Sequence, residues 1–262
     1  MTTRVTSLPT AASGEAVART ASAAQDSSFV RSVFSLLERT EYRRCDSGED
    51  LEDIYRLRYR AYRVHGVVPA MLSRSIHDDL DEVANVHRFG VYVDQKLVST
   101  LRIHKLDRDN RAGPSTQAFG DIVEPMIDAG DTFIDPSRFA ADPEWSKVWP
   151  QIPYITLRLA GMACFHYETP YCLSTVREDH AAFYKRIYDS HRIGEARAYP
   201  GVYTKVELYR ADVEAIRERS FQRFPFFFAT KAEQKLMFDP PQPGEPLPLT
   251  ILPTAKYTRH AA

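Results

Sequence analysis

Cysteine is scarce in this chain, and no cysteine pair has a spacing that suits metal binding. Cys45, Cys164 and Cys172 form no Cys-x-x-Cys pair, and His-Glu-x-x-His and phosphate-loop sequences are also missing. Cys164 and Cys172 lie in apolar segments, where cysteine is usually a small hydrophobic residue. These absences disfavour zinc and nucleotide enzymes. They predict a reducing, cytoplasmic setting and no metal site.

Net charge and long apolar runs are missing as well. The 262 residues carry a formal net charge of −1, so no global field attracts nucleic acid or an anionic membrane. No apolar run approaches roughly 18 residues, and the N-terminus lacks the apolar core of a secretory signal. We therefore predict a soluble protein without stable membrane insertion. Residues 1–27, rich in Ala, Ser and Thr, predict a disordered leader.

The remaining chain has enough apolar side chains for a sizeable core, with 44% hydrophobic and 11% aromatic residues. Its periodicities predict helices, an antiparallel meander and then β-α-β-α-β-β. This order indicates a mixed α/β, or α+β, domain over residues 28–222. Residues 223–262 form an aromatic helical segment and a Pro-rich tail that we expect to pack on the domain.

The central stretch of the sequence is DTFIDPSRFAAD, residues 131–142. It begins as a strand, but Pro136 lacks the backbone donor that a β-ladder needs, so we expect a bulge or splay there. Asp135 and Arg138 stand at this break. In a regular strand, positions three apart face opposite sides, so the two side chains converge only if a bulge resets the alternation. The alternative is a strand end with one surface ion pair.

Charged side chains gather in two segments before this strand. A predicted helix over residues 51–66 carries four arginines that form either a solvated face or an anion-binding face: Arg56, Arg58, Arg60 and Arg63. A polar loop follows that holds His77, Asp78, Asp79, Asp81 and Glu82. The loop lacks the spacing of a calcium site, so we interpret it as an acidic pocket wall. Arg102 then interrupts an apolar strand of the hairpin over residues 88–106, whose predicted turn is Gln95 and Lys96. After the central strand we expect an aromatic, proline-bearing loop at residues 144–153.

Four motifs in this order resemble the N-acyl amino acid synthases and the related acyl-homoserine-lactone synthases, within the GNAT-type acyltransferases. They are Arg58-x-x-x-Tyr62, Asp78-x-x-Asp81, Arg102 in a Leu-Arg pair, and Asp135-Pro-Ser-Arg138-Phe139. The resemblance covers roughly residues 40–212. It implies a GNAT-type fold, with a central mixed and mostly antiparallel sheet flanked by helices and splayed at the fourth main strand.

Three departures from the family pattern bear on function. The family motif E-x-S-R-F begins with glutamate, whereas Asp135 is one methylene shorter. The tryptophan that lactone synthases place after their first motif is replaced by VHGVVP. The glycine-rich pyrophosphate loop of acetyl-CoA-dependent relatives is absent, since SRFAADPEWSKVW has no glycine. Such loops hold coenzyme A phosphates, so their loss favours a donor thioester on the phosphopantetheine of acyl carrier protein, with no tightly bound cofactor.

The resemblance implies transfer of a long-chain fatty acyl group from acyl carrier protein to the α-amine of an amino acid. Such a site must deprotonate the amine, stabilise an oxyanion and protonate the leaving thiolate. We expect Asp135 to orient the amine or pass on its proton, and Arg138 to hold Asp135 or the acidic loop. Backbone N–H groups near Phe139 and Ala140 would bind the oxyanion. Tyr184 is either the acid for the thiolate or a packing residue.

The resemblance also assigns three groups of supporting residues. A linked charge network would hold the acceptor, with Tyr62 beside it: Arg58, Asp78, Asp81 and Arg102. An acyl channel would be lined by residues that could equally be core: Met162, Phe165, Leu173 and Val176. Docking of the acidic carrier protein would use Lys147, Arg158, Lys185 and Arg186.

Two other functions remain open from the sequence. One is a lactone synthase that makes a diffusible signal from S-adenosylmethionine. The other is a non-catalytic GNAT-like domain that binds a lipid or carrier protein through the RFPFFF segment. In that segment, Phe224, Phe226, Phe227 and Phe228 could instead cap the core.

Overall fold

In the computed structural model, which describes residues 27–241, 244 and 250–258, seven strands form one sheet. The strands are β1 (Thr40–Arg44), β2 (Val86–Val93), β3 (Lys96–Leu106), β4 (Phe133–Ala141), β5 (Tyr171–Val176), β6 (His191–Ala198) and β7 (Lys205–Asp212). Their spatial order is β1-β2-β3-β4-β5-β7-β6. Only β4 and β5 are parallel, so the expectation of a mixed, mostly antiparallel sheet is confirmed.

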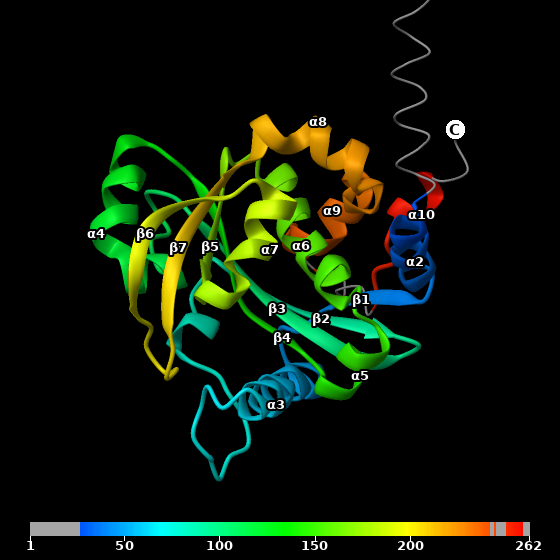
Figure 1. The fold of residues 1–262 in the computed structure, drawn as a ribbon, viewed down its shortest axis with the longest axis horizontal. Helices are drawn as coiled ribbons and strands as arrows, with labels where there is room; N and C mark the ends of the chain where they lie inside the picture. The colour runs from blue at the N-terminus through cyan, green and yellow to red at the C-terminus, as the bar shows by residue number, and fades with distance from the viewer. Residues whose placement is uncertain (1–26, 242–243, 245–249, 259–262) are drawn as a thin grey trace, which may run out of the picture.

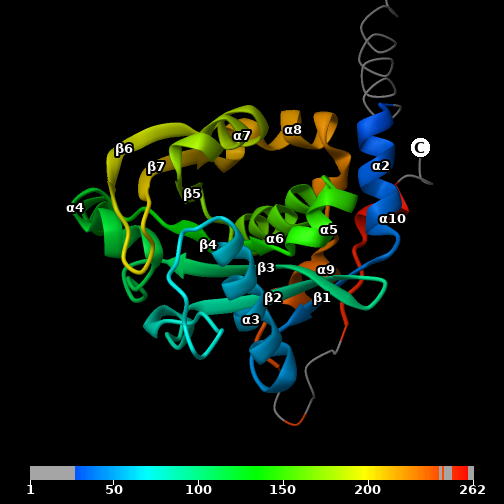
Figure 2. The same ribbon diagram turned by 60° about the horizontal axis from the view of Figure 1, so that its bottom comes forward.

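Helices cover both faces of this sheet (Figure 1). One face packs against α3 (Gly48–Val64) and α4 (Pro114–Ala129). The other carries α2 (Ser28–Leu37), α6 (Ile152–His166), α7 (Glu178–Tyr188), α8 (Val213–Arg223) and α9 (Lys231–Phe238). Figure 2 shows α6, α7 and α8 above the sheet, with α3 on the opposite side. The remaining helices are short: η1 (Asp79–Asp81), α5 (Pro143–Val148), η2 (Pro225–Phe227) and α10 (Ala255–Thr258).

The hydrophobic core is divided between the two faces. A large cluster joins β1–β4 to α2, α6, η2 and α9, and a smaller one packs α4 against β3, β4, β5 and β7. Helix α6 contributes buried residues on all sides, because it lies between the sheet and the C-terminal segment. Burial of apolar area at about 25 cal/mol per Å² makes these clusters the main stabilising contribution.

The C-terminal segment differs from the single aromatic helix that the sequence predicts. Pro225 ends α8 and begins η2, since proline cannot continue a helix, and α9 starts only at Lys231. Phe224, Phe226 and Phe227 are buried, so these three rings cap the core, while Phe228 is 36% exposed. Further along, Ile251 pairs with Tyr42 of the edge strand β1 and covers that edge.

Two local predictions also need correction. The aromatic loop expected at residues 144–153 contains the short helix α5, which Asp142 caps by accepting hydrogen bonds from the Glu144 and Trp145 N–H groups. The β2–β3 turn is at Asp94 and Gln95, not at Gln95 and Lys96. Both turn residues have positive φ, as a tight two-residue hairpin requires. The predicted leader, except Ser27, and part of the Pro-rich tail lie outside the described residues.

Candidate active site

Strand β4 diverges from β5 at Pro136, where the sequence predicts, and bulges against β3 two residues further on. Arg102 of β3 pairs with Ser137, whereas Thr100 pairs with Ala140, so Arg138 and Phe139 together oppose Leu101. Arg138 takes φ +51° to make this bulge. On its other side, β4 pairs with β5 only at Phe133 and Ile134. The two strands then diverge, and the predicted splay at the fourth main strand is confirmed.

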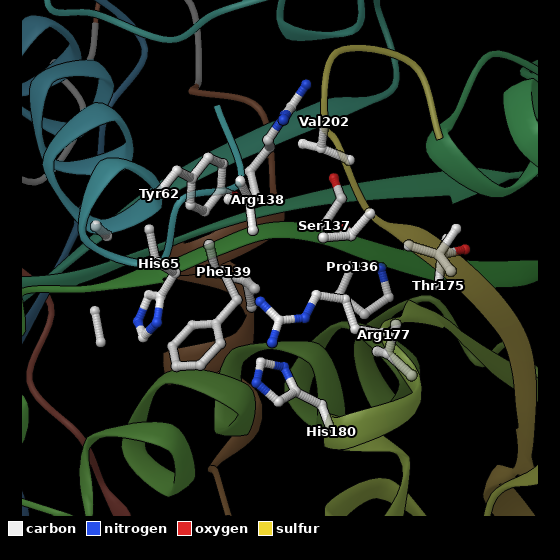
Figure 3. Close-up of a pocket in the computed structure, with 18 of the residues that line it drawn as sticks. Tyr62, His65, Pro136, Ser137, Arg138, Phe139, Thr175, Arg177, His180 and Val202 are labelled. Atoms are coloured by element: carbon white, nitrogen blue, oxygen red, sulfur yellow. The ribbon is translucent and has the colours of Figure 1, made fainter. Parts of the chain in front are cut away.

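A cavity of about 500 Å³ occupies the opening between the diverging strands. Figure 3 shows Tyr62, Arg138 and Val202 on one side of β4, and Arg177 and His180 on the other. The residues that line the cavity come from α3 and the β6–β7 hairpin on one face of the sheet, and from α6 and α7 on the other. Two molecules can therefore approach the same point from opposite faces of the sheet.

A smaller, mostly apolar cavity of about 60 Å³ continues from the first between α6, α7 and α8. The two cavities share Pro136, Leu157, Ser174 and Tyr184. Among the predicted channel residues, Phe165 lines the small cavity and Val176 the large one. Met162 and Leu173 line neither.

The helix or strand that carries each residue explains why Met162 and Leu173 lie away from the cavities. Met162 faces the interior beside Arg158, with its sulfur 3.4 Å from Arg158 Nη1. Leu173 packs against α4, because alternation along β5 turns it away from Cys172 and Ser174. Neither residue is in contact with the space in which an acyl chain would lie.

The predicted charge network is assembled between α3, η1 and β3. Arg58 Nη1 donates to both carboxylate oxygens of Asp81, at 2.9 and 3.0 Å, and both side chains are fully buried. Arg102 contacts Asp78 and also lies 3.1 Å from Asp81. Arg138 donates to the other oxygen of Asp78. Burial alone would raise the pKa of Asp78, but Arg138 and Arg102 lower it well below its usual range.

The charge network explains why acidic residues gather in the loop around Asp78. Asp78 and Asp81 are used to pair arginines, so they are not free to bind a cation. Within the described residues, no group of three His, Cys, Asp or Glu side chains is arranged to hold a metal ion.

Asp135 lies behind the cavity wall and does not contact Arg138. Its carboxylate is completely buried, and it accepts hydrogen bonds from the backbone N–H and the hydroxyl of Ser115, at 2.8 and 2.7 Å. The Ser115 hydroxyl also lies 2.8 Å from that of Thr175, which lines the cavity. The expected convergence of Asp135 and Arg138 is therefore wrong: Arg138 holds the acidic loop. No local sequence pattern indicated Ser115 and Thr175, which lie 20 and 40 positions from Asp135.

Burial raises the pKa of Asp135 from its ordinary value of 3.8 to about 6, although the Ser115 hydrogen bonds and the Arg102 charge oppose this. The folded state thus favours the protonated carboxyl, and this contribution to stability is lost as the pH rises through about 6. We expect the unfolding free energy of wild type, relative to Asp135→Asn, to fall by about 2 kcal/mol between about pH 4.5 and about pH 8. Urea unfolding of both proteins at each pH tests this. A constant difference would contradict it.

Several predicted residues do reach the cavity. Phe139, Ala140 and Tyr62 line it, and Tyr184 lies at its junction with the apolar extension. Burial raises the pKa of the Tyr184 phenol well above its usual range, so the phenol is protonated at neutral pH. Sequence analysis did not single out Arg177, His180 and Tyr199, which also line the cavity. The sequence indicates these residues by position alone, because Arg177 and His180 follow β5 and Tyr199 lies in the β6–β7 hairpin.

Of the predicted docking residues, Lys147, Lys185 and Arg186 are exposed. Arg158 cannot dock a partner, because it is fully buried and pairs with Glu233 at 2.5 Å. Three of the arginines on α3 line an open groove together with Arg74: Arg56, Arg60 and Arg63. The groove adjoins the cavity through Val64, Pro143 and Glu144. In the described part of the chain, no helix is long and apolar enough to cross a membrane.

Comparison with known proteins gives the same fold. The solved structure of FeeM, an N-acyl amino acid synthase from uncultured soil microbes, is 15% identical, and the match covers 71% of this chain and 97% of FeeM with a TM-score of 0.59. The acyl-homoserine-lactone synthase LasI is 14% identical, with coverage of 66% and 89% and a TM-score of 0.50. BjaI, a CoA-dependent acyl-homoserine-lactone synthase, is 9% identical, with coverage of 67% and 82% and a TM-score of 0.50.

No curated protein matches the sequence. A family model described as N-acyl amino acid synthase FeeM matches residues 53–212, which is more than half of the chain. The matched residues run from α3 to the end of β7, and so include the charge network, the β4 bulge and the large cavity, whereas the α8 wall of the small cavity lies beyond them. The chain therefore belongs to the FeeM family of N-acyl amino acid synthases, which are N-acyltransferases.

Proposed function

We propose that this chain transfers a long-chain fatty acyl group from the phosphopantetheine thioester of acyl carrier protein to the α-amine of an amino acid. The observation that carries the proposal is the cavity that passes through the sheet between β4 and β5 and continues into an apolar extension. The acyl chain of the thioester lies on the α6 and α7 face, where the apolar extension begins, and the acceptor lies on the α3 face. The reacting atoms then meet beside the β4 bulge.

The donor side of the cavity suits an acyl thioester. The apolar extension between α6 and α8 holds the beginning of the acyl chain, with Phe165, Leu157 and Ala160 on its walls. The β5-facing edge of β4 beyond Ile134 has no strand partner among the described residues. Backbone N–H groups at Phe139 and Ala140 are therefore the candidates to bind the oxyanion. Tyr184 donates its proton to the thiolate as the carbon–sulfur bond breaks.

The acceptor side is built around Arg138. Its side chain is 8% exposed, and its Nε has no hydrogen-bond partner in the described structure. Burial alone would lower its pKa, but Tyr62, the Asp78 carboxylate and Tyr199 raise it. A guanidinium in such a partly enclosed site binds a carboxylate strongly. We assign Arg138 to the α-carboxylate of the amino acid, with Tyr62 and Tyr199 beside it.

Mass spectrometry of lipid extracts from a bacterial host that expresses the chain tests this function, with Arg138→Ala as the control. The expected products are an ion series spaced by two methylenes that shares one amino-acid fragment. Lactone fragments and released methylthioadenosine would instead identify a synthase that uses S-adenosylmethionine. If folded wild-type protein makes no new lipid, the non-catalytic carrier-binding domain replaces our proposal.

The groove lined by α3 arginines predicts where the carrier protein docks. It adjoins the cavity, and acyl carrier proteins are acidic. We expect the double variant Arg60→Glu/Arg63→Glu to lower kcat/KM for acyl carrier protein about 10-fold, with a smaller effect at high salt. Turnover of a short acyl-pantetheine thioester should not change.

The double variant Lys185→Glu/Arg186→Glu makes the same change of charge on α7. It serves as the matched control, because these two residues line neither cavity. A larger loss in this variant than in the α3 variant would move the docking surface to α7. Equal turnover of all three proteins would contradict docking at either surface.

A further inference from the structure

Asp135 is the motif residue expected to take the proton of the acceptor amine, but its place in the structure does not match a direct role. It is fully buried, while the reacting atoms must lie in the cavity. The family motif has glutamate at this position, and the shorter aspartate carboxylate is set further back from the cavity. The space between Asp135 and the cavity is bridged by two hydroxyl groups.

These hydroxyls form a continuous hydrogen-bonded line. Asp135 Oδ1 lies 2.7 Å from Ser115 Oγ, and Ser115 Oγ lies 2.8 Å from Thr175 Oγ1. Ser115 is completely buried, whereas Thr175 is partly exposed at the cavity. With an ionised Asp135, Ser115 donates to the carboxylate and is free to accept from Thr175. Thr175 can then accept a hydrogen bond from a group in the cavity.

The first turn of α4 fixes this geometry. The helix begins at Pro114, so the Ser115 N–H is one of the donors without a partner inside the helix, and it donates to Asp135 Oδ2 at 2.8 Å. At Gly113, an added Cβ would lie 3.1 Å from the same oxygen, so glycine permits the close approach. These contacts hold the carboxyl group in place, with one oxygen directed to the hydroxyl line.

We propose that Thr175 and Ser115 relay a proton from the ammonium group of the acceptor to the carboxylate of Asp135. This inference rests on the proposed N-acyl transfer and deepens it. The ammonium gives one proton to Thr175 Oγ1, Thr175 gives its own to Ser115 Oγ, and Ser115 gives its own to Asp135. The free amine lone pair then forms the carbon–nitrogen bond.

The remaining step balances the reaction. As the tetrahedral intermediate collapses, the carbon–sulfur bond breaks and its electron pair leaves on sulfur. The thiolate takes a proton from Tyr184, and the nitrogen loses its second proton, which restores Tyr184 through solvent in the cavity. The proton on Asp135 returns to solvent by the same hydroxyl line. The net products are the amide, the thiol and one proton.

Other charged groups near Asp135 do not offer a shorter path. The Arg102 guanidinium lowers its pKa and carries no acceptor. His104, its partner across the β3–β4 ladder, is buried and hydrogen-bonds to the Leu80 carbonyl through Nε2. The charge of Asp135 contributes to raising the pKa values of Tyr199 and Cys172, so both side chains remain protonated. Of the residues that the structure describes, Thr175 is the one that joins the line to the cavity.

Steady-state kinetics of purified full-length protein with acyl carrier protein thioester and amino acid test the relay. We expect Thr175→Val to lower kcat/KM about 100-fold at about pH 7, a typical loss for general base catalysis. The loss should shrink severalfold by about pH 9.5, where more acceptor arrives as the free amine. Ser115→Ala should follow the same profile, and Thr175→Ser should restore most activity.

Thr100→Val is the matched control. It removes a buried strand hydroxyl that has no hydrogen-bond partner in the described structure, so its kinetics should equal those of wild type. Wild-type rates in Thr175→Val, or a loss that is the same at every pH, would overturn the relay and leave the N-acyl transfer intact. Failure of wild type to acylate any amino acid would overturn the proposed function and the relay with it.

Discussion

Replacing Arg138 with alanine is expected to lower kcat/KM for the amino-acid acceptor by about 1,000-fold, mainly through a higher KM. Removal of a charge-assisted, partly enclosed contact to a carboxylate costs about 3–4 kcal/mol, which sets this magnitude. The Asp78 carboxylate keeps its contact with Arg102, so the loop should remain ordered. Arg138→Lys retains the charge but loses the planar fork, and an intermediate loss is expected.

An acceptor that lacks a carboxylate shows whether Arg138→Ala loses activity through acceptor binding or through misfolding. With an amino-acid methyl ester, wild type should fall towards the rate of Arg138→Ala, and the variant should hardly distinguish ester from acid. Arg219→Ala, which removes an exposed arginine paired with Asp189, is the control and should behave as wild type. If Arg138→Ala still prefers the free acid as strongly as wild type does, the assignment of Arg138 is wrong.

The largest effect on stability is expected at Arg158. Its guanidinium is completely buried and donates to both Glu233 oxygens, at 2.5 and 2.8 Å, and to the carbonyls of Phe226 and Phe228. Glu233 also accepts from Thr254, so the pair ties α9 and the last described residues to α6. Arg158→Met leaves Glu233 buried without its cation, and should lower the free energy of unfolding by about 3–5 kcal/mol.

A double variant tests the cause of that loss. Arg158→Met/Glu233→Met replaces both charges with apolar side chains, and it should be more stable than Arg158→Met alone. Urea unfolding of the two single variants and the double variant gives the coupling free energy. Additive losses in the three proteins would show that the buried ion pair is not the source of the effect.

Much of the fold follows from local sequence patterns. The alternation in residues 88–106 predicts the β2–β3 hairpin, and Pro136 predicts the break in β4, because a residue without a backbone donor interrupts a ladder wherever it occurs. The errors lie where a local pattern is ambiguous. Pro225 could begin a new turn or end a helix, and the chain does both there.

The position of Arg158 shows a signal that the sequence contained. Helix α6 is apolar on all sides, and such a helix is buried on all sides. An arginine within it must therefore be buried and paired rather than exposed at a docking surface. The partner, Glu233, is 75 positions away, and no local pattern indicates it.

The sequence by itself determined the order of helices and strands, the splay of β4 at Pro136 and the chemical groups available near it, since these depend on neighbouring residues. Only the tertiary structure decided which groups meet. It pairs Arg138 with Asp78 instead of Asp135, and it joins Asp135 to the cavity through Ser115 and Thr175. The reason is physical: buried polar groups must find hydrogen-bond partners, and packing between distant segments determines which partners are within reach.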